Sequence, residues 1–292
     1  MSTAATTPQK ITVHASAENR RTPGAWAVLV GLILVALAWL FPLYIAVANA
    51  FKKPAEFAQK GALAFPEHID FTAIKKFWND VNYGLMLKNS IMVSLFVAVV
   101  GVTLSFLTAY AIGIGRVKGR MTILALFMVA FTLPQEASIY PLYTIAQKIG
   151  LYDNKLSIML VGAIAMSGFG TYMLSSVLSE FPHEMLEAAR VDGANSRRIL
   201  WNIVLPLVRP TLLVLATFFF IWQWNEFLIP LVLLPSNDNQ TVALALGVTT
   251  GQYTSDPTTR AAAALVGFLP SLMFFIAFQR TLMRGVTMGS VK

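Results

Sequence analysis

Two carboxyl groups stand inside stretches of this chain that are otherwise apolar, and each has polar or aromatic neighbours. Glu136 directly follows Gln135, and Glu226 closes the run Trp222, Gln223, Trp224, Asn225, Glu226. A carboxylate at the centre of a bilayer costs about 2.5 kcal/mol or more, so such a residue usually faces a cavity or a partner. Proteins bind sugars with amides and carboxylates that hydrogen-bond the hydroxyl groups and with aromatic faces that stack on ring C–H groups. These residues therefore predict a polar pathway able to carry a sugar.

The same residues also have a plainer interpretation. The two glutamates can serve as hydrogen-bonding contacts between helices, and the tryptophans can belong to the aromatic belt at a membrane interface. Pro134 and Pro230 lie close by, and we expect them to break the helical backbone where water or protein satisfies the freed groups. The sequence leaves both interpretations open.

A polar, helix-forming block lies between two of the apolar stretches. It fits the pattern Glu-Ala-Ala, three residues, Gly, nine residues, Ile-x-Leu-Pro, which a random window matches on the order of 1 time in 10⁸. The fixed positions are Glu187, Ala188, Ala189, Gly193, Ile203, Leu205 and Pro206. Asn195 or Ser196 can cap a helix, and a glycine suits a left-handed helix end. The block therefore predicts a helix over Pro182–Asp192, a turn at Gly193 and a second helix that runs toward Pro206.

The first of these helices has a surface suited to contact with another protein. Ala188 and Ala189 expose almost no side chain, so we expect a partner's surface to close over the backbone there. Glu187 and Arg190 are three residues apart and can pair with each other or reach across an interface. The alternative is an amphipathic helix in the headgroup plane, with Arg197–Arg198 on anionic lipid.

Six apolar stretches are long enough to cross about 30 Å of hydrocarbon as helices, for which about 20 residues are needed. They run approximately over residues 25–50, 89–114, 121–143, 156–178, 207–234 and 261–278. With 56% hydrophobic and 12% charged residues, the composition is that of a membrane protein. We expect an all-α, polytopic fold made of an N-terminal arm (1–24), a six-span domain (25–284) with the polar block in a loop at 180–206, and a C-terminal tail (285–292).

The stretch 89–114 carries small residues at a spacing of four: Gly101, Ser105, Ala109 and Gly113. Such a stripe lets a neighbouring helix backbone approach closely. We expect it to be a packing face, although small residues are also common on lipid-facing surfaces.

The basic residues predict the orientation of the spans. Six spans put both ends of the chain on one side, and with the ends in the cytoplasm 13 of the 22 lysines and arginines face inward and 9 outward. The short basic turn at residues 116–120 supports this orientation more firmly than the totals do. Six lysines in or beside the loop 51–88 remain outside, and we attribute them to a folded external segment. The polar block then faces the cytoplasm.

Several activities are excluded by what the sequence lacks. There is no cysteine, so no disulfide or thiolate metal site is possible. No Gly-Lys dipeptide occurs, so a phosphate-binding Walker A loop is absent, and no HExxH or nucleophile elbow is present. The net charge of +8 is scattered and forms no basic patch for nucleic acid. We expect a chain that is not an enzyme and depends on another protein to use ATP.

Four segments of the chain resemble one family. They are the polar block, Lys88-Asn89-Ser90, Trp224-Asn225-Glu226-Phe227, and the tail Gly285-Val286-Thr287-Met288-Gly289-Ser290-Val291-Lys292. Together they are similar to the transmembrane permease subunits of binding-protein-dependent ABC importers, in the carbohydrate-uptake (maltose-type) branch. Six spans and this tail resemble the smaller member of the permease pair.

The resemblance implies a set of partners in a prokaryotic inner membrane. They are a homologous second permease subunit, a dimer of cytoplasmic ATPase subunits, an extracytoplasmic sugar-binding protein and membrane lipid. ATP and Mg²⁺ are implied on the ATPase, and no cofactor on this chain. The implied ATPase-coupling residues are Glu187, Ala188, Ala189, Arg190, Asp192, Gly193, Ile203, Leu205 and Pro206, with Gly289, Ser290, Val291 and Lys292 as a tail contact.

Other functions fit the same scaffold. A polyol or glycerol phosphate could be the ligand, but a phosphate calls for clustered arginines and the only arginine expected in the outer half is Arg260. A neutral sugar or oligosaccharide is therefore preferred. An ion-coupled secondary transporter would use Glu136 and Glu226 as ion sites, but no inverted repeat is evident within six spans.

Overall fold

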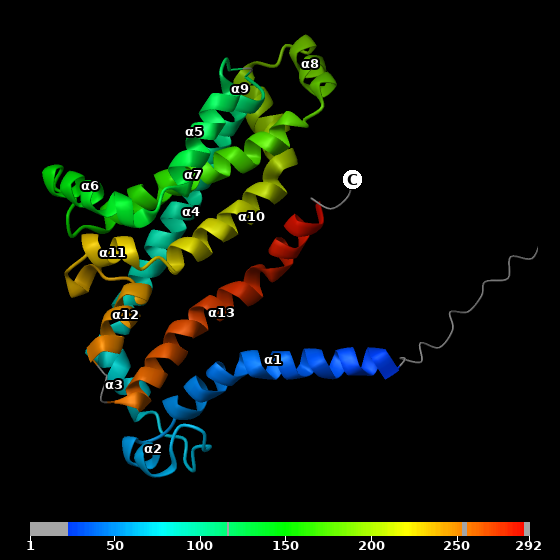
Figure 1. Cartoon of the computed structure of the whole chain (residues 1–292). Helices are drawn as coiled ribbons and strands as arrows, with labels where there is room; N and C mark the ends of the chain where they lie inside the picture. The colour runs from blue at the N-terminus through cyan, green and yellow to red at the C-terminus, as the bar shows by residue number, and fades with distance from the viewer. Residues whose placement is uncertain (1–22, 116, 253–255, 289–292) are drawn as a thin grey trace, which may run out of the picture. The chain divides into compact units, whose positions relative to one another are not determined.

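The computed structural model describes residues 23–115, 117–252 and 256–288 (Figure 1). The expected N-terminal arm lies outside these residues except for its last two positions. The predicted tail contact at Gly289, Ser290, Val291 and Lys292 also lies outside them. The chain divides into two units, Met1–Tyr44 and Ile45–Lys292, and each is described by itself.

Helix α1 (Pro23–Ala50) begins in the first unit and ends in the second. Between Gly24 and Ala50 it is apolar on every side, which is typical of a helix surrounded by lipid or protein. Pro42 lies inside the helix and cannot donate a backbone hydrogen bond. Such a residue is tolerated in membrane helices, where neighbours or small adjustments satisfy the freed carbonyl.

Regular structure in the described residues is entirely helical, so the prediction of an all-α fold is confirmed. In the second unit the helices are α2 (Pro54–Lys60), α3 (Thr72–Asp80), α4 (Tyr83–Gly113), α5 (Arg120–Thr132), α6 (Gln135–Lys148), α7 (Lys155–Ser179), α8 (His183–Val191), α9 (Ser196–Ile199), the π turn η1 (Leu200–Val204), α10 (Leu205–Trp224), α11 (Leu228–Leu233), the 3-10 turn η2 (Asn237–Asn239), α12 (Val242–Gln252) and α13 (Pro257–Met288). Across the described residues, five helices are long and apolar enough to cross a membrane. A sixth crossing is possible if the bent pair α5–α6 forms one span.

Two of the expected spans differ from the prediction. The stretch 121–143 is not one straight helix, because α5 and α6 meet at an angle of 92°. Leu133 precedes Pro134 and is held in an extended conformation, as residues before proline usually are. The stretch 207–234 is also interrupted, but at Asn225–Phe227 rather than at Pro230, which lies within α11. Glu226 therefore lies at a helix break and not inside a helix.

The core of the second unit is formed by α4, α7 and α10, and the small-residue stripe on α4 packs in it as expected. A Cβ atom added to Gly101 would lie 3.1 Å from the ring of Phe219 on α10. One added to Gly113 would lie 3.0 Å from Leu178 on α7. Phe219 also fills the space beside Gly170 of α7, so its ring joins all three helices.

Hydrogen bonds attach the two ends of α4 to different loops. Near the end of α4, the hydroxyl group of Tyr110 donates to the carbonyl of Ser196, the first residue of α9 (3.2 Å). Near its start, the side-chain amide of Asn89 donates to the carbonyls of Asp238 and Gln240 around η2 (2.9 and 3.0 Å). Figure 1 shows α8 and α9 near one end of α4 and α12 near the other. We call these the α8 end and the α11 end, because α11 packs with α12 on the second side.

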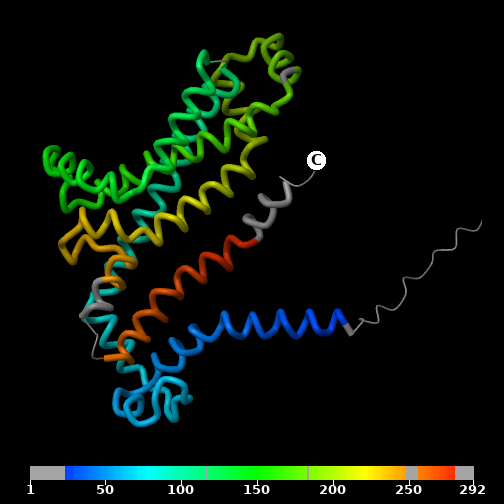
Figure 2. Tube along the Cα trace, in the orientation of Figure 1, coloured from blue at the N-terminus to red at the C-terminus, as the bar shows by residue number. Residues whose placement is uncertain are grey.

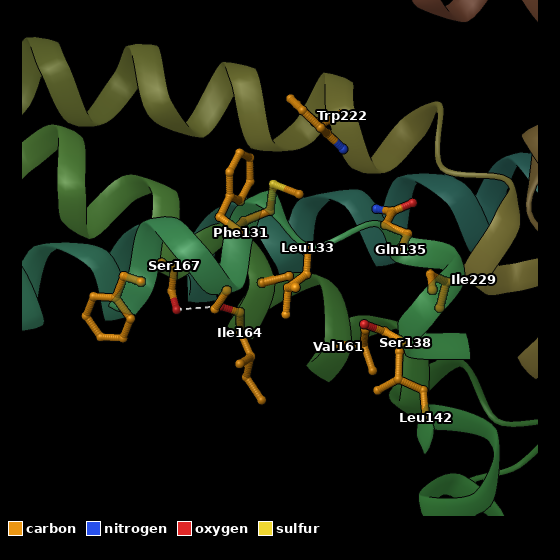
Figure 3. A pocket seen from close by; sticks show the side chains of 15 residues that line it. Phe131, Leu133, Gln135, Ser138, Leu142, Val161, Ile164, Ser167, Trp222 and Ile229 are labelled. Carbon is orange, nitrogen blue, oxygen red and sulfur yellow. Dashed lines mark hydrogen bonds between the residues drawn. The ribbon is translucent and has the colours of Figure 1, made fainter. Parts of the chain in front are cut away.

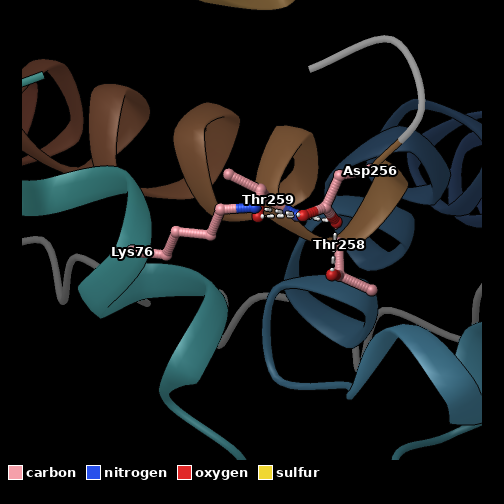
Figure 4. A network of polar contacts seen from close by, with 4 residues as sticks. All are labelled: Lys76, Asp256, Thr258 and Thr259. Atoms are coloured by element: carbon pink, nitrogen blue, oxygen red, sulfur yellow. Dashed lines mark hydrogen bonds and ion pairs between the residues drawn. The ribbon is translucent and has the colours of Figure 1, made fainter. Parts of the chain in front are cut away.

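The lysine-rich segment between α1 and α4 is folded, as its composition predicted, and most of its charges are paired. Lys52 is fully buried and donates to the side-chain oxygen of Asn49 and the carbonyl of Gly61 (3.0 and 3.1 Å), and its burial lowers the pKa of its ammonium group. Three further lysines form ion pairs, as follows: Lys53 with Asp70, Lys60 with Glu67, and Lys76 with Asp256. The last pair joins α3 to the start of α13 (Figure 4). Local pairing therefore explains why so many lysines occur in one loop.

Candidate functional site

The polar block folds as its sequence predicts. Helix α8 ends at Val191, and Gly193 adopts a left-handed conformation with φ of 79°. The side chain of Asn195 then accepts a hydrogen bond from the backbone N–H of Arg198 (2.9 Å) and so caps α9. Helix, glycine turn and capped helix are thus confirmed.

The residues of α8 that are buried and those that are exposed differ from the prediction. Leu186 and Ala189 are buried in the core cluster, with 3% and 8% of their surface exposed. Ala189 therefore seats α8 on the bundle, and its expected role as an open surface for a partner is wrong. Four of the exposed residues recur at helical spacing and form what we call the α8 surface: Glu184, Glu187, Ala188 and Val191.

Val191 is the apolar residue on the α8 surface that sequence reasoning missed, and 88% of it is exposed. Val191 follows Glu187 by four residues and Ala188 by three, and this spacing could have placed it on the same helix face as them. Glu187, Arg190 and Asp192 are also exposed, and none of them forms an ion pair among the described residues. Their charges remain available to a partner, which leaves the coupling role of this surface a prediction.

One continuous helix leads away from this block. Residues Ser196–Trp224 run through α9, η1 and α10 without a break, which is 29 residues or about 43 Å (Figure 2). Pro206 lies within this helix, and its ring crowds the carbonyl four residues earlier. The π turn directly before it relaxes that geometry, because Leu205 N–H bonds back to the carbonyl of Leu200. Ile203 and Leu205 pack against the core cluster, so they seat this helix as expected.

The far end of the same helix borders a cavity of about 710 Å³ (Figure 3). Its walls come from α5, the start of α6, the middle of α7, Trp222 of α10 and Ile229 of α11. Most of the lining is apolar or aromatic. The ring centroids of Phe131 and Trp222 lie 6.0 Å apart. Gln135, Ser138 and Ser167 are its polar side chains. The mixture of aromatic faces and a few polar groups is typical of a small-molecule site.

A polar contact joins the two helix breaks beside this cavity. The side-chain amide of Gln135 donates to Oε2 of Glu226 (3.3 Å). Oε1 of Glu226 accepts from the backbone N–H groups of Leu228 and Ile229 (3.0 and 3.2 Å), which caps α11. The predicted residues Gln135, Trp222 and Glu226 are thus brought together by the structure.

Three other predicted pathway residues lie apart from the cavity. Gln223 is buried, and its side-chain oxygen packs against Gly162 of α7. Trp224 is also buried and stacks on Phe220, so the expectation that these two residues line the pathway is wrong. Asn225 is exposed but donates to the carbonyl of Ile221 at the end of α10 (2.7 Å). Successive helical residues point in different directions, so the run could not act as one surface.

Glu136 is the remaining predicted pathway residue. It lies in the first turn of α6 and is exposed. No hydrogen bond or ion pair joins it to another described residue. Its side chain is therefore free to act on a ligand or a partner.

Fold and site together define a class: a multi-pass helical membrane protein in which one continuous helix runs from an exposed polar block to a cavity. The comparison with protein families identifies that class. Residues 92–288 match the family described as the binding-protein-dependent transport system inner membrane component, and the chain belongs to this family. It is an inner membrane component of such a transport system.

Individual relatives agree with this assignment. The chain is 29% identical over 261 residues to the probable starch degradation products transport system permease protein AmyC of Thermoanaerobacterium thermosulfurigenes, covering 89% of this chain and 94% of the relative. It is 31% identical over 279 residues to the sn-glycerol-3-phosphate transport system permease protein UgpE of Yersinia pestis, covering 92% and 98%.

Solved structures share the fold. A chain of a bacterial ABC transporter involved in the import of the acidic polysaccharide alginate has a TM-score of 0.75 at 23% identity, covering 91% of this chain and 98% of that chain. A chain of a bacterial alginate transporter in complex with an alginate pentasaccharide-bound periplasmic protein has a TM-score of 0.60 at 15% identity, covering 88% and 95%.

Proposed function

We propose that this chain is the transmembrane permease subunit of an ATP-driven importer for a neutral sugar or oligosaccharide. It forms half of the translocation pathway together with a homologous second permease subunit. An extracytoplasmic binding protein delivers the sugar, and a dimer of cytoplasmic ATPase subunits binds ATP and Mg²⁺. Both ends of the chain face the cytoplasm.

The continuous helix Ser196–Trp224 carries this proposal. Ile199 and Leu200 near its start belong to the same core cluster as Leu186 and Ala189 of α8, whose exposed surface offers a place for an ATPase to dock, and its last residues border the cavity. A movement of α8 can therefore be passed to the cavity along one continuous helix. The proposed cycle is alternating access, in which closure of the ATPase dimer changes the side from which the cavity is open.

The choice of a sugar rests on two observations. Aromatic side chains and a few hydrogen-bonding groups line the cavity, as stacking on a sugar ring requires. A relative named for starch degradation products carries a saccharide in its name. A glycerol phosphate ligand, suggested by the name of another relative, is less well supported by the cavity lining.

Uptake into proteoliposomes tests the proposal directly. The chain is purified with its co-assembling permease, ATPase and binding protein, and the binding protein is first screened for the sugar that it retains. With the binding protein outside, we expect uptake of that sugar to require ATP and Mg²⁺ inside the vesicles, on the side that the ATPase faces, and to persist when ion gradients are collapsed. Uptake that continues without ATP and stops with the ion gradient would instead identify an ion-coupled transporter.

Val191 tests the coupling step. Val191→Asp places a charge where an apolar contact is expected, and we expect sugar-stimulated ATP hydrolysis to fall at least tenfold while the complex still reaches the membrane. Val117→Asp, the same change in the turn between α4 and α5 at the same end of the molecule, serves as the control. Normal stimulated hydrolysis in an assembled Val191→Asp complex would show that the α8 surface does not couple.

A further inference from the structure

The cavity carries no charged side chain in its lining, yet carboxylates stand at its edge. Its polar lining residues, Gln135, Ser138 and Ser167, are neutral. Glu226 is held against Gln135 by a hydrogen bond, and Glu136 is the next residue along α6. A ligand in the cavity therefore has a carboxylate beside one of its polar lining residues.

Both helices that start beside the cavity carry one of these carboxylates. A helix N-terminus has free backbone N–H groups and a positive dipole end, which together favour an anion. At α11 the amides of Leu228 and Ile229 are already occupied by Oε1 of Glu226. At α6 the first turn contains Glu136. The first amides of α11 are thus satisfied by the chain's own carboxylate, and a second carboxylate lies in the first turn of α6.

Cations that could compensate these charges lie elsewhere in the surrounding helices. The basic residues of α5, α6, α7 and α10 do not line the cavity: Arg120 is the first residue of α5, Lys148 the last of α6, Lys155 the first of α7, and Arg209 is the fifth of α10, nearer its α8 end. The ion pairs within the described part of the chain involve neither Glu136 nor Glu226.

We propose that Glu226, positioned by Gln135 and assisted by Glu136, makes the cavity a charge filter that admits neutral, hydroxyl-rich ligands and rejects phosphates and carboxylates. A sugar hydroxyl donates to the remaining lone pairs of Glu226 and accepts from the amide of Gln135. An anionic ligand finds two like charges and no cationic side chain in the lining. This inference rests on the proposed function.

The absence of cysteine from the chain allows the local charge to be measured without knowing the transported sugar. Ser138 lines the cavity, and Ser138→Cys puts a single thiol there. The assembled complex in membrane vesicles is treated with an anionic (sulfonatoethyl) and a cationic (trimethylammonioethyl) methanethiosulfonate. Labelling of this chain is followed by mass, and each rate is divided by the rate of the same reagent with a free small thiol.

We expect the cationic reagent to react faster than the anionic one, after this correction. Adding Glu226→Gln should reduce the preference by about three- to tenfold, the size expected for one unit charge acting through a partly aqueous path. Asp238→Asn removes the same charge from an exposed side chain near η2 and should leave the preference unchanged.

Three results would overturn the filter. They are equal corrected rates for the two reagents, a preference that Glu226→Gln does not alter, and a thiol that neither reagent reaches. Glu136→Gln is the second variant, because Glu136 is exposed and its loss should not disturb folding, and it should shift the preference in the same direction. The labelling requires no transport, so a failed sugar-uptake assay and a failed filter are distinguishable.

Discussion

The helix Ser196–Trp224 has two differently built ends, and the difference shows how one element can serve two purposes. At the α8 end the backbone stays helical despite Pro206 and Pro210, with the π turn η1 taking up the distortion. At the α11 end the backbone leaves the helix at Asn225–Phe227, a segment without proline. In the proposed mechanism, a continuous helix suits the end that would transmit movement from an ATPase, and a break suits the end that places polar groups beside the cavity.

Side chains explain why the break falls where it does. The backbone N–H groups of Leu228 and Ile229 at the start of α11 donate to the carboxylate of Glu226, so groups that a break would leave unpaired in an apolar environment are satisfied by a residue of the break itself. The carbonyl of Ile221, at the end of α10, accepts from both the backbone N–H and the side-chain amide of Asn225. At the α8 end, Val204 and Val208 are buried, and the helix continues through its prolines.

The largest effect is expected where the two ends are connected. Phe219 is 1% exposed and fills the space beside Gly101 and Gly170, so Phe219→Ala leaves a cavity at the junction of α4, α7 and α10. We expect a loss of about 3–5 kcal/mol in the free energy of unfolding, with transport lost as well. Denaturant titration of the purified complex measures the loss.

Phe218→Ala is the matched control for this change, because Phe218 is the preceding residue of the same helix and is half exposed. It should alter the free energy of unfolding by about 0.5 kcal/mol or less, as surface substitutions usually do. Equal losses for the two variants would mean that the junction does not hold the helices together.

A smaller effect should distinguish the α8 end from the α11 end by function rather than stability. Gly193 and Gly150 have φ of 79° and 72°, and neither would meet another atom within 4 Å if a Cβ were added. A β-branched residue is strained at such φ by about 1–2 kcal/mol, so Gly193→Val and Gly150→Val should destabilise equally. Gly150 lies in the loop between α6 and α7, away from the polar block.

We expect only Gly193→Val to reduce sugar uptake strongly, by about tenfold or more. A strain of about 1.4 kcal/mol lowers the population of the native turn conformation by that factor. Uptake and melting temperature are measured on both variants in the same complex. If Gly150→Val reduces uptake as much as Gly193→Val at equal stability, the turn at Gly193 has no special place in coupling.

The two ends also differed in how far the sequence predicted them. At the α8 end the signals were local: a capping Asn195, a left-handed Gly193 and a helix between them. Local backbone chemistry determines such a unit, so its structure was predicted almost residue by residue. Which face of α8 is buried was not predicted, because the burial of Ala189 depends on residues of the core cluster that come from other helices.

At the α11 end the composition of the pathway was predicted but its geometry was not. Glu136, Gln135 and Glu226 were recognised because polar groups in apolar stretches are costly. Which neighbours shared their cavity depended on where the helix broke, and proline alone was a poor guide: Pro134 marked a break, whereas Pro230 did not. The burial of Gln223 and Trp224 followed from packing against α7 and α13, which no local pattern encodes.

The smallest effect concerns the clamp that ties α3 to α13 at the end away from α8. Burial raises the pKa of Asp256, but hydrogen bonds from Lys76, Thr259 and Thr258 outweigh it and hold that pKa well below the usual range (Figure 4). A lowered folded-state pKa stabilises the fold above the unfolded-state value of about 3.9, and this contribution is lost as pH falls through the folded-state pKa. Asp256→Asn keeps a helix-capping side chain and removes only the charge.

Asp256→Asn should therefore lower stability by about 1 kcal/mol or less above pH 5, since Lys76 is partly exposed and exposed ion pairs contribute little. The difference from the unaltered protein should shrink steadily below about pH 4, because the carboxylate of the unfolded chain then takes up a proton while the folded one, with its lowered pKa, still does not. Melting temperatures of the two complexes between pH 3 and 7 measure it, with Asp238→Asn as a control whose difference stays flat. If the difference in melting temperature between the two proteins grew on acidification, the carboxylate of Asp256 would not be stabilising the fold. The clamp would then not hold α3 on α13.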